Sequence, residues 1–397
     1  MSQNKIRVLR IANRLNIGGP TYNVCNLTKY LSEDFQTLLV AGQEDPSEKS
    51  SLYIAEKMGI QPRIIASMQR SIHPIKDKKA YNEIRQIIRE FKPHIVHTHA
   101  AKAGAIGRYA AYKENVPVII HTYHGHVFHS YFNPLKTYIF LTIERYLGKK
   151  SNALIAISPL QKKELSQSFK IGPASKFEVV PLGFNFEKFF TSMDNKRLDF
   201  RRKWRLDEQT LAIGIIGRLV PIKNHAMFLL GFAQAKKKIT KNVQVYFIGD
   251  GETKQELMRL CKSLHLSFSL KPCANSDVIF TSWISDVDRV LAGIDLVCLT
   301  SKNEGTPVSL IEAGCAGKPF ISTDVGGIKD ILEDPSQGCV LEDNSIEALE
   351  TELVSHIDRA ILGDTLPLSV RERVANRYGY KQLCLSMAQI YTRLLSL

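Results

Sequence analysis

The chain has 397 residues, enough for two or three domains with sizeable hydrophobic cores. Hydrophobic residues make up 44% of it and charged residues 23%, which excludes disordered, collagen-like and fibrous proteins. The net charge of +14 is uneven, because residues 1–180 hold 26 basic and 13 acidic residues whereas residues 181–397 hold 27 and 26. The first half is therefore expected to face an anionic partner. Nucleic acid is not expected as that partner, since the basic residues are not interleaved with a stacking platform.

The seven cysteines are scattered without a C-x-x-C pair, which indicates reduced thiols rather than disulfides or a thiolate zinc site. We expect no secretory leader, and no apolar stretch approaches the ~18 to 20 residues that span a bilayer. The sequence therefore predicts a cytoplasmic protein and leaves peripheral contact with the inner face of the plasma membrane open.

Short β-branched runs alternate with helical patterns almost from end to end, which is typical of parallel sheets with helices on both faces. The first half predicts helices over 82–91 and 103–113 and strands at 6–12, 37–41, 63–66, 94–98, 118–122, 153–157 and 178–180. A second series of strands is predicted at 212–216, 243–248, 278–281, 296–300 and 319–322. The pattern predicts an α/β protein with two doubly wound sheets.

The stretch 182–207 is aromatic and charged without clean periodicity, so we interpret it as an interdomain connection. A boundary near residue 187 gives an N-terminal domain over 1–186 and a C-terminal domain over 187–379. The last segment, 380–397, has apolar residues at helical spacing and predicts a helix that must pack this face on the rest of the protein.

Three glycine-bearing turns follow predicted strands, where open α/β sheets bind their ligands. The paired glycines 18–19 precede a helix N-terminus that can hold an anion, although a plain tight turn explains them equally well. The turn at 217–223 carries Arg218 and Lys223, two cations that would neutralise a diphosphate. The turn at 249–251 has two glycines that permit close backbone approach.

A fourth junction, at residues 300–314, combines a helix start with two carboxylates. Pro307 suits the first helical turn, which would leave the nearby backbone amides free to hold a phosphate. Glu304 is expected in the loop and Glu312 in the helix, about 10 to 15 Å apart along the chain path. That reach suits two hydroxyl-bearing groups on either side of a diphosphate, as in a sugar nucleotide.

These features together resemble family 4 of the retaining glycosyltransferases. The resemblance is carried by the E-x7-E pair Glu304 and Glu312, the G-R-L-x-x-x-K run at 217–223, the glycine turns at 18–19 and 249–251, and the D-V-G-G run at 324–327. It covers nearly the whole chain and implies the GT-B fold. In that fold two Rossmann-like domains face each other across a cleft, and the last helix crosses back onto the N-terminal domain.

The resemblance also assigns roles to individual residues. Arg218 and Lys223 would stabilise the leaving diphosphate, and Glu304 would lie near the donor sugar. With His124 these three form the expected catalytic set. Glu312 would bind the ribose hydroxyls, and the segment around Ile284 is expected beside the base. The full set of expected donor-binding residues is Gly18, Gly19, Gly249, Asp250, Gly251, Ile284, Gly305, Thr306, Pro307, Val308 and Glu312.

Several histidines end two adjacent predicted strands, at positions 97 and 99 and at 121, 124, 126 and 129. A zinc site is disfavoured because the neighbouring segment 100–108 offers no carboxylate or thiolate ligand. The resemblance instead places one active-site histidine here. His124 is the expected residue, His126 is its rival, and structural hydrogen bonding is expected of the others.

The D-x-D run at 286–288 is the metal-binding pattern of another glycosyltransferase fold. Here it precedes a helical pattern, so capping with an acidic first turn is the preferred interpretation. We therefore expect no metal site, no metal requirement and no other cofactor.

The run 134–150 combines apolar and aromatic residues with a basic end, which fits an interfacial helix and a core helix equally well. A second basic stretch, 70–79, is expected to lie in a loop. With the excess charge of the first half, these stretches favour an anionic membrane surface as a partner.

The sequence thus predicts a glycosyltransferase of cell-surface polysaccharide biosynthesis. It would move a hexose or N-acetylhexosamine from a nucleotide diphosphate sugar to a glycan or lipid-linked acceptor. UDP is the expected nucleotide because it is common in the family. Two alternatives remain open, a sugar-nucleotide epimerase or hydrolase of related architecture and a non-catalytic nucleotide-sugar-binding subunit that recruits a partner to the membrane.

Overall fold

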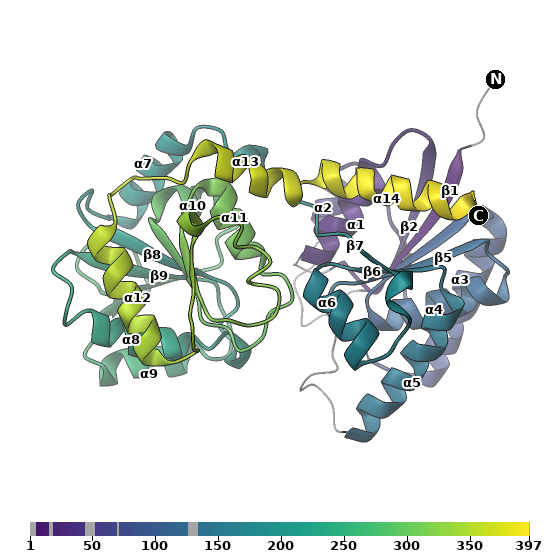
Figure 1. The fold of residues 1–397 in the computed structure, drawn as a ribbon, viewed down its shortest axis with the longest axis horizontal. Coiled ribbons are helices and arrows are strands. Elements are labelled where there is room, and N and C mark those ends of the chain that lie inside the picture. The colour runs from purple at the N-terminus through teal and green to yellow at the C-terminus, as the bar shows by residue number, and fades with distance from the viewer. Residues whose placement is uncertain (1–4, 16–18, 44–51, 70, 126–133, 397) are drawn as a thin grey trace. The chain divides into compact units, whose positions relative to one another are not determined.

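The computed structural model describes residues 5–15, 19–43, 52–69, 71–125 and 134–396. The chain forms two compact units. The first contains Met1–Phe184 and Arg377–Leu397, and the second contains Asn185–Asn376. Each unit has a seven-stranded parallel sheet with helices packed around it (Figure 1).

The first sheet has the strand order β3-β2-β1-β4-β5-β6-β7. Its strands are β1 (Ile6–Ala12), β2 (Phe35–Gly42), β3 (Arg63–Ile65), β4 (Ile95–His99), β5 (Val118–Tyr123), β6 (Ala153–Ala156) and β7 (Phe177–Val179). The helices of this unit are α1 (Gly19–Lys29), α2 (Leu52–Lys57), α3 (Pro74–Phe91), α4 (Ala101–Lys113), α5 (Pro134–Lys150), α6 (Pro159–Lys163) and α14 (Tyr380–Leu395).

The second sheet has the order β10-β11-β9-β8-β12-β13-β14. Its strands are β8 (Leu211–Ile216), β9 (Val243–Ile248), β10 (Phe268–Ser269), β11 (Val278–Ser282), β12 (Leu296–Leu299), β13 (Phe320–Ser322) and β14 (Gly338–Val340). Its helices are α7 (Met193–Trp204), α8 (His225–Ala235), α9 (Lys254–Ser263), α10 (Val287–Gly293), α11 (Val308–Ala316), α12 (Ile346–Arg359) and α13 (Leu368–Arg377).

The predicted α/β class with two doubly wound sheets is confirmed. Every predicted strand is present, with its ends shifted by two residues at most. Two further strands, β10 and β14, were not predicted; they lie at the two edges of the second sheet and have two and three residues. Strands this short carry too few side chains to show an alternating pattern.

The expected connection at 182–207 is wrong in its second half, because α7 occupies Met193–Trp204. Phe200 and Trp204, one helical turn apart, are buried, and a Cβ on Gly293 of α10 would lie 2.1 Å from the Phe200 ring. The other positions of α7 are mostly charged, and one of them, Arg201, is also buried, so the apolar pattern of this helix rests on two rings. The missing side chain of Gly293 lets the two helices approach closely.

The expected loop at 70–79 is also wrong, because α3 begins at Pro74. The side chain of His73 accepts a hydrogen bond from the backbone N–H of Lys76 and caps the helix, and Pro74 occupies the first turn. Histidine is not among the preferred N-cap residues, so the sequence did not indicate a helix start here. The lysines at 76, 78 and 79 therefore lie on the first turns of α3.

The last helix, α14, packs on the sheet of the first unit. Its Leu383, Met387 and Ile390 join a buried cluster with Val8 and Ile95 of the central strands. Burial of each such side chain contributes roughly 1.5 to 3 kcal/mol. The apolar face predicted for the C-terminal segment therefore packs on the N-terminal sheet, although some 200 residues of a second unit lie between them in the sequence.

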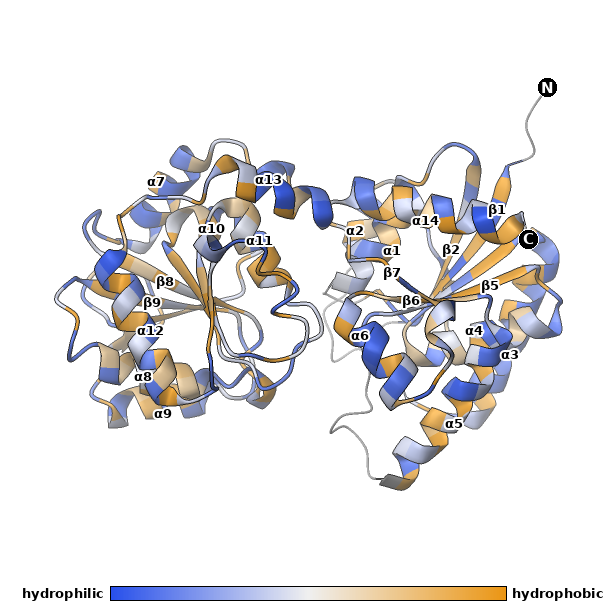
Figure 2. Cartoon of the chain, in the orientation of Figure 1, coloured by the Kyte–Doolittle hydropathy of each residue, from blue (hydrophilic) through white to orange (hydrophobic). Residues whose placement is uncertain are grey.

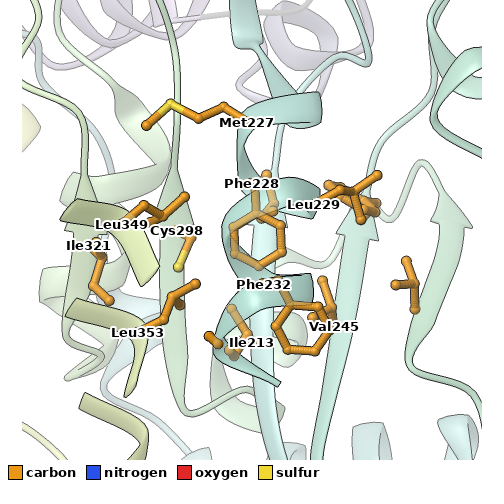
Figure 3. Close-up of a cluster of buried hydrophobic side chains, with 14 of the residues drawn as sticks. Ile213, Met227, Phe228, Leu229, Phe232, Val245, Cys298, Ile321, Leu349 and Leu353 are labelled. Carbon is orange, nitrogen blue, oxygen red and sulfur yellow. The ribbon is translucent and has the colours of Figure 1, made fainter. Parts of the chain in front are cut away.

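The core of the second unit lies between its sheet and the helices α8 and α12 (Figure 3). Phe228 and Phe232 of α8 stack one turn apart, with ring centroids 5.9 Å apart. The same cluster contains Cys298 of β12 and Ile321 of β13, which pair in the sheet and are fully buried. This rigid core holds the carboxyl ends of β8 and β12 in place.

Candidate functional site

Both sheets reverse their strand order at one point, between β1 and β4 in the first unit and between β8 and β12 in the second. Such switch points leave room for a ligand outside the carboxyl ends of the strands. The turn after β8 carries Arg218 and Lys223, and the loop after β12 carries Glu304. The strongest sequence candidates therefore lie at the switch point of the second sheet.

The structure joins two of the three expected catalytic residues of the second unit directly. The Nζ atom of Lys223 lies 2.5 Å from Oε1 of Glu304, and Ser301 Oγ donates to the same oxygen at 2.6 Å. The backbone N–H of Lys302 donates to the carbonyl of Ile222 at 2.8 Å, which ties the two loops together. Arg218 is exposed. Ser301 was missed by the sequence analysis because a single serine in a loop has no signature.

The turn after β9 is fixed by a close backbone approach. Gly249 has φ +151°, and a Cβ there would lie 1.9 Å from the carbonyl oxygen of Gly217, so only glycine fits. Asp250 accepts hydrogen bonds from Ser282 Oγ at 2.8 Å and Lys254 Nζ at 3.1 Å. Burial raises the pKa of Asp250, but these hydrogen bonds outweigh it and the net pKa is lowered. Asp250 thus holds the loop in shape in this structure.

The backbone of the D-V-G-G run at 324–327 packs closely against the loop that carries Glu304. Gly326 has φ +58°, and a Cβ there would lie 1.7 Å from the carbonyl oxygen of Glu304. The backbone N–H of Gly327 donates to the carbonyl of Gly305 at 3.0 Å. The sequence analysis used this run for the family resemblance only, whereas the structure gives it a local role in shaping the loop.

Helix α11 begins at Val308, with Pro307 at the N-cap position. The expectation that Pro307 lies within the first turn is wrong by one residue, because its ψ of 107° is extended. The first backbone N–H groups of α11 have no partner within the helix, which favours an anion at this end. The Oγ1 atom of Thr306 is buried there and has no hydrogen-bond partner in the described parts of the chain, which adds a donor for such an anion.

Glu312 lies on α11, half-buried. Burial raises the pKa of its carboxyl to about 7, with Lys188 lowering it and Asp288 raising it further. A carboxyl poised near neutral pH inside a helix is a common feature of functional sites. Ile284, the residue expected near the base, is half-buried just after β11, and its neighbour Trp283 is exposed.

The histidines of the first unit form a buried hydrogen-bonded chain at the carboxyl ends of β4 and β5. Nδ1 of His99 lies 2.9 Å from Nε2 of His124, and Nη1 of Arg10 lies 3.4 Å from Nε2 of His99. His97 contacts Arg10 at 3.0 Å, Thr122 Oγ1 at 2.7 Å and the hydroxyl of Tyr391 on α14 at 2.5 Å. The expectation of structural hydrogen bonding for His97 and His99 agrees with these contacts.

Arg10 determines which ring nitrogen of each histidine carries the proton. Burial lowers the pKa values of His97 and His99 well below the usual range of histidine, and it lowers the pKa of His124 to about 4. All three rings are therefore neutral at pH 7. Since arginine can only donate, Nε2 of His99 accepts, and its proton must be on Nδ1. His99 then donates to Nε2 of His124. The proton of His124 is therefore on Nδ1, an atom shielded from solvent that has no partner among the described residues.

Other sequence candidates lie elsewhere or outside the described residues. Gly18 and His126 are outside them, and Gly19 is the first residue of α1. The interpretation of the D-x-D run as a helix start with an acidic first turn is confirmed, since Asp286 is at the N-cap position of α10 and Asp288 lies in its first turn, but the Asp286 side chain makes no cap bond. Asp288 pairs with Lys196 of α7 at 2.9 Å.

Among the described residues, only one group of three or more metal-type ligands has its ligand atoms within 4.8 Å of one another: Cys339, Glu352 and His356. This group is at the amino end of the second sheet, where β14 begins, and hence away from the switch point. The histidines of the first unit pair with arginine, hydroxyls and one another, and in the described parts of the chain they do not converge on a common point.

Two family matches together span most of the chain. Residues 17–188 match Glycosyltransferase Family 4, and residues 196–376 match the family described as glycosyl transferases group 1. The chain belongs to the family 4 glycosyltransferases and has the two-domain α/β GT-B fold. Glycosyltransferase activity follows from this membership.

Two relatives and one solved structure are similar to this chain over most of its length. The UDP-Gal:alpha-D-GlcNAc-diphosphoundecaprenol alpha-1,3-galactosyltransferase of Escherichia coli is 27% identical over 321 residues, 79% of each chain. The capsular polysaccharide biosynthesis glycosyltransferase CapM of Staphylococcus aureus is 25% identical and covers 83% of this chain and 85% of its own. The crystal structure of Anabaena HepE in complex with UDP has a TM-score of 0.79 at 16% identity, covering 98% of this chain and all of HepE.

Proposed function

We propose that the protein is a retaining, metal-independent glycosyltransferase of surface-polysaccharide assembly that uses a UDP-sugar. The observation that carries this proposal is the pairing of Lys223 with Glu304 at the switch point of the second sheet. The Escherichia coli relative is named for transfer from UDP-galactose to a diphosphoundecaprenol-linked sugar, and HepE was crystallised with UDP. A UDP-sugar donor and a lipid-linked glycan acceptor are therefore the substrates that we infer.

The proposed chemistry needs stabilisation of the leaving diphosphate. Negative charge develops on that group as the anomeric bond breaks, and preorganised cations and backbone N–H groups lower the barrier. Arg218, Lys223 and the first amides of α11 offer that stabilisation without a divalent ion. Glu304, held by Lys223 and Ser301, is placed to accept from hydroxyls of the donor sugar.

Calorimetry with UDP, GDP, ADP and CMP, with and without EDTA, tests the donor class. We expect selective binding of UDP that EDTA does not change, and nuclear magnetic resonance of the product should show the anomeric configuration of the donor. UDP binding only with a divalent ion would contradict metal independence. Consumption of donor without acceptor would favour the epimerase or hydrolase, and binding without any turnover would favour the recruiting subunit.

Donor binding should depend on pH through Glu312. Only its carboxylate accepts fully from two ribose hydroxyls, and with a pKa of about 7 it is largely protonated at pH 6. UDP affinity should therefore rise between about pH 6 and 8, with release of a proton on binding. Calorimetry in buffers of different ionisation enthalpy measures this proton. The Glu312→Gln variant should show neither effect.

The same raised pKa affects stability with the opposite sign. A folded-state pKa above the unfolded value of about 4.5 stabilises the protein at low pH, and this contribution is lost as the pH rises from about 4.5 to 7. The unliganded Glu312→Gln variant should thus lose less stability than the wild type over that range. Equal pH dependence of unfolding in both proteins would contradict the assignment.

His124 should act as a donor through Nδ1 toward a substrate oxygen. The amide N–H of asparagine can replace Nδ1–H, whereas the longer glutamine places its amide near Nε2. We expect kcat/KM of the His124→Asn variant to exceed that of His124→Gln about tenfold, the effect of one lost hydrogen bond. The reverse order would show that Nε2 is the active nitrogen and would contradict the role of Arg10.

Membrane contact is the last part of the proposal. Among the described helices none is both long and apolar enough to cross a bilayer. The excess of basic residues in the first half would attract an anionic leaflet, at about 1 kcal/mol for each lysine or arginine close to the surface. A lipid-linked acceptor would place the enzyme at that leaflet.

A further inference from the structure

The helices α4 and α5, together with Tyr81 of α3, line an open apolar groove on the surface of the first unit. It has a volume of about 550 Å³ and lies within the range typical of ligand sites. Alanine, isoleucine, leucine and tyrosine side chains dominate its lining. The lining residues are Tyr81, Ala105, Ile106, Tyr109, Thr142, Ile143, Tyr146 and Leu147.

The apolar surface continues beyond the groove along α5. Leu135, Tyr138 and Ile139 are 69%, 65% and 49% exposed. They precede the groove residues Ile143 and Tyr146 at helical spacing, so one face of α5 is apolar from its first turn to its last. Figure 2 shows these hydrophobic segments alternating with polar ones along α5. Of the two interpretations of the run 134–150, the exposed apolar face favours the interfacial helix.

Basic residues predominate on the two helices that supply most of the groove lining, although Arg108 is paired with Glu144 and Lys102 with Asp77 of α3. The helices α4 and α5 carry seven basic residues and one acidic residue, Glu144, which is buried. At their carboxyl ends Lys113 lies 5.5 Å over the ring of Tyr109, and Lys150 lies 5.8 Å over the ring of Tyr146. The two lysines thus stand at the rim of the groove, next to the rings that line it.

We propose that this groove binds one acyl chain of an anionic phospholipid, whose phosphate contacts Lys113 and Lys150. An apolar channel with cations at one end complements an amphiphile with a negative headgroup. Tyrosine rings with an apolar body and a polar tip are enriched where protein meets the membrane interface. The inference rests on the membrane contact proposed above and gives it a specific lipid site.

Fluorescence quenching tests whether the chain enters the groove. The two native tryptophans, Trp204 and Trp283, are in the second unit, so a Tyr146→Trp variant reports from the groove. Vesicles of phosphatidylcholine and phosphatidylglycerol with mid-chain bromine should quench its emission. A matched Leu385→Trp variant, on an exposed position of α14, should show much less quenching.

Vesicle sedimentation separates the lipid site from general attraction. An Ile143→Glu variant should lose about tenfold in binding to the anionic vesicles, since a charge enters the apolar face. Neutralising Lys113 and Lys150 to glutamine should lose about fivefold for each lysine. Leu385→Glu should bind as the wild type does. Circular dichroism checks that each variant is folded.

The outcomes distinguish the two proposals. If the wild type ignores anionic vesicles, the proposed membrane contact itself fails. If it binds them but Tyr146→Trp is not quenched, or Ile143→Glu binds normally, only the groove assignment is overturned. Binding that requires a polyprenyl phosphate in neutral vesicles would show that the acceptor lipid, rather than a phospholipid, occupies the groove. Glycosyl transfer to a water-soluble acceptor is measured separately and should be unchanged in Ile143→Glu.

Discussion

Replacing Lys223 by alanine is expected to lower kcat by about 10²- to 10³-fold, the usual effect of removing one preorganised group from a developing oxyanion. The ammonium of Lys223 is held 2.5 Å from Glu304 and beside the loop that precedes α11. It is thus fixed before the donor binds, and no reorganisation is needed when charge develops. Arg218→Ala should have a smaller effect on kcat and a larger one on donor binding, because Arg218 is exposed and must be ordered by the ligand.

Steady-state and single-turnover rates with a UDP-sugar measure this expectation, and urea unfolding checks that the fold is intact. Lys238→Ala is the matched control, since Lys238 makes a similar ion pair with Glu350 on the same unit but away from the switch point. Full activity of both Lys223→Ala and Arg218→Ala would overturn the leaving-group role. A Lys223→Arg variant should recover little, because a planar guanidinium does not replace a compact ammonium beside Glu304.

The second-unit site could be located from sequence because its signals are local. Glycine turns, a helix start and charged residues directly after predicted strands indicate carboxyl-end loops without knowledge of the fold. What could not be predicted depends on contacts between distant segments. The pairing of Lys223 with Glu304 joins residues 81 positions apart, and the close approach of Gly326 to Glu304 depends on backbone geometry.

In the first unit the sequence indicated where the histidines lie but not which side chains they bond to. The histidines were identified at strand ends, but their tautomers depend on Arg10, which lies 89 residues before His99. The sequence carries no sign that Arg10, in the middle of a strand, is fully buried. Glu144 was hidden in the same way, since a single carboxylate in an apolar helix looks solvent-facing until Arg108 is placed against it.

Breaking the pair of Arg108 and Glu144 should give the largest loss of stability. Both side chains are buried, and Nη2 of Arg108 lies 2.8 and 2.7 Å from the two carboxylate oxygens of Glu144. Tyr123 donates to Glu144 at 2.7 Å. Burial lowers the pKa of Arg108, but Glu144 outweighs this and the net pKa is raised. Burial and Glu144 both raise the pKa of Tyr123. The three groups join α4, α5 and β5.

Glu144→Ala leaves a buried guanidinium without its counter-charge, and we expect it to cost about 3 to 5 kcal/mol in the free energy of unfolding. Replacing all three polar groups, as in Arg108→Met, Glu144→Leu and Tyr123→Phe combined, should recover most of that loss because no buried charge or donor remains unpaired. Urea unfolding of the single and triple variants measures both values. A single variant with near wild-type stability would show that water reaches Arg108 and compensates its charge.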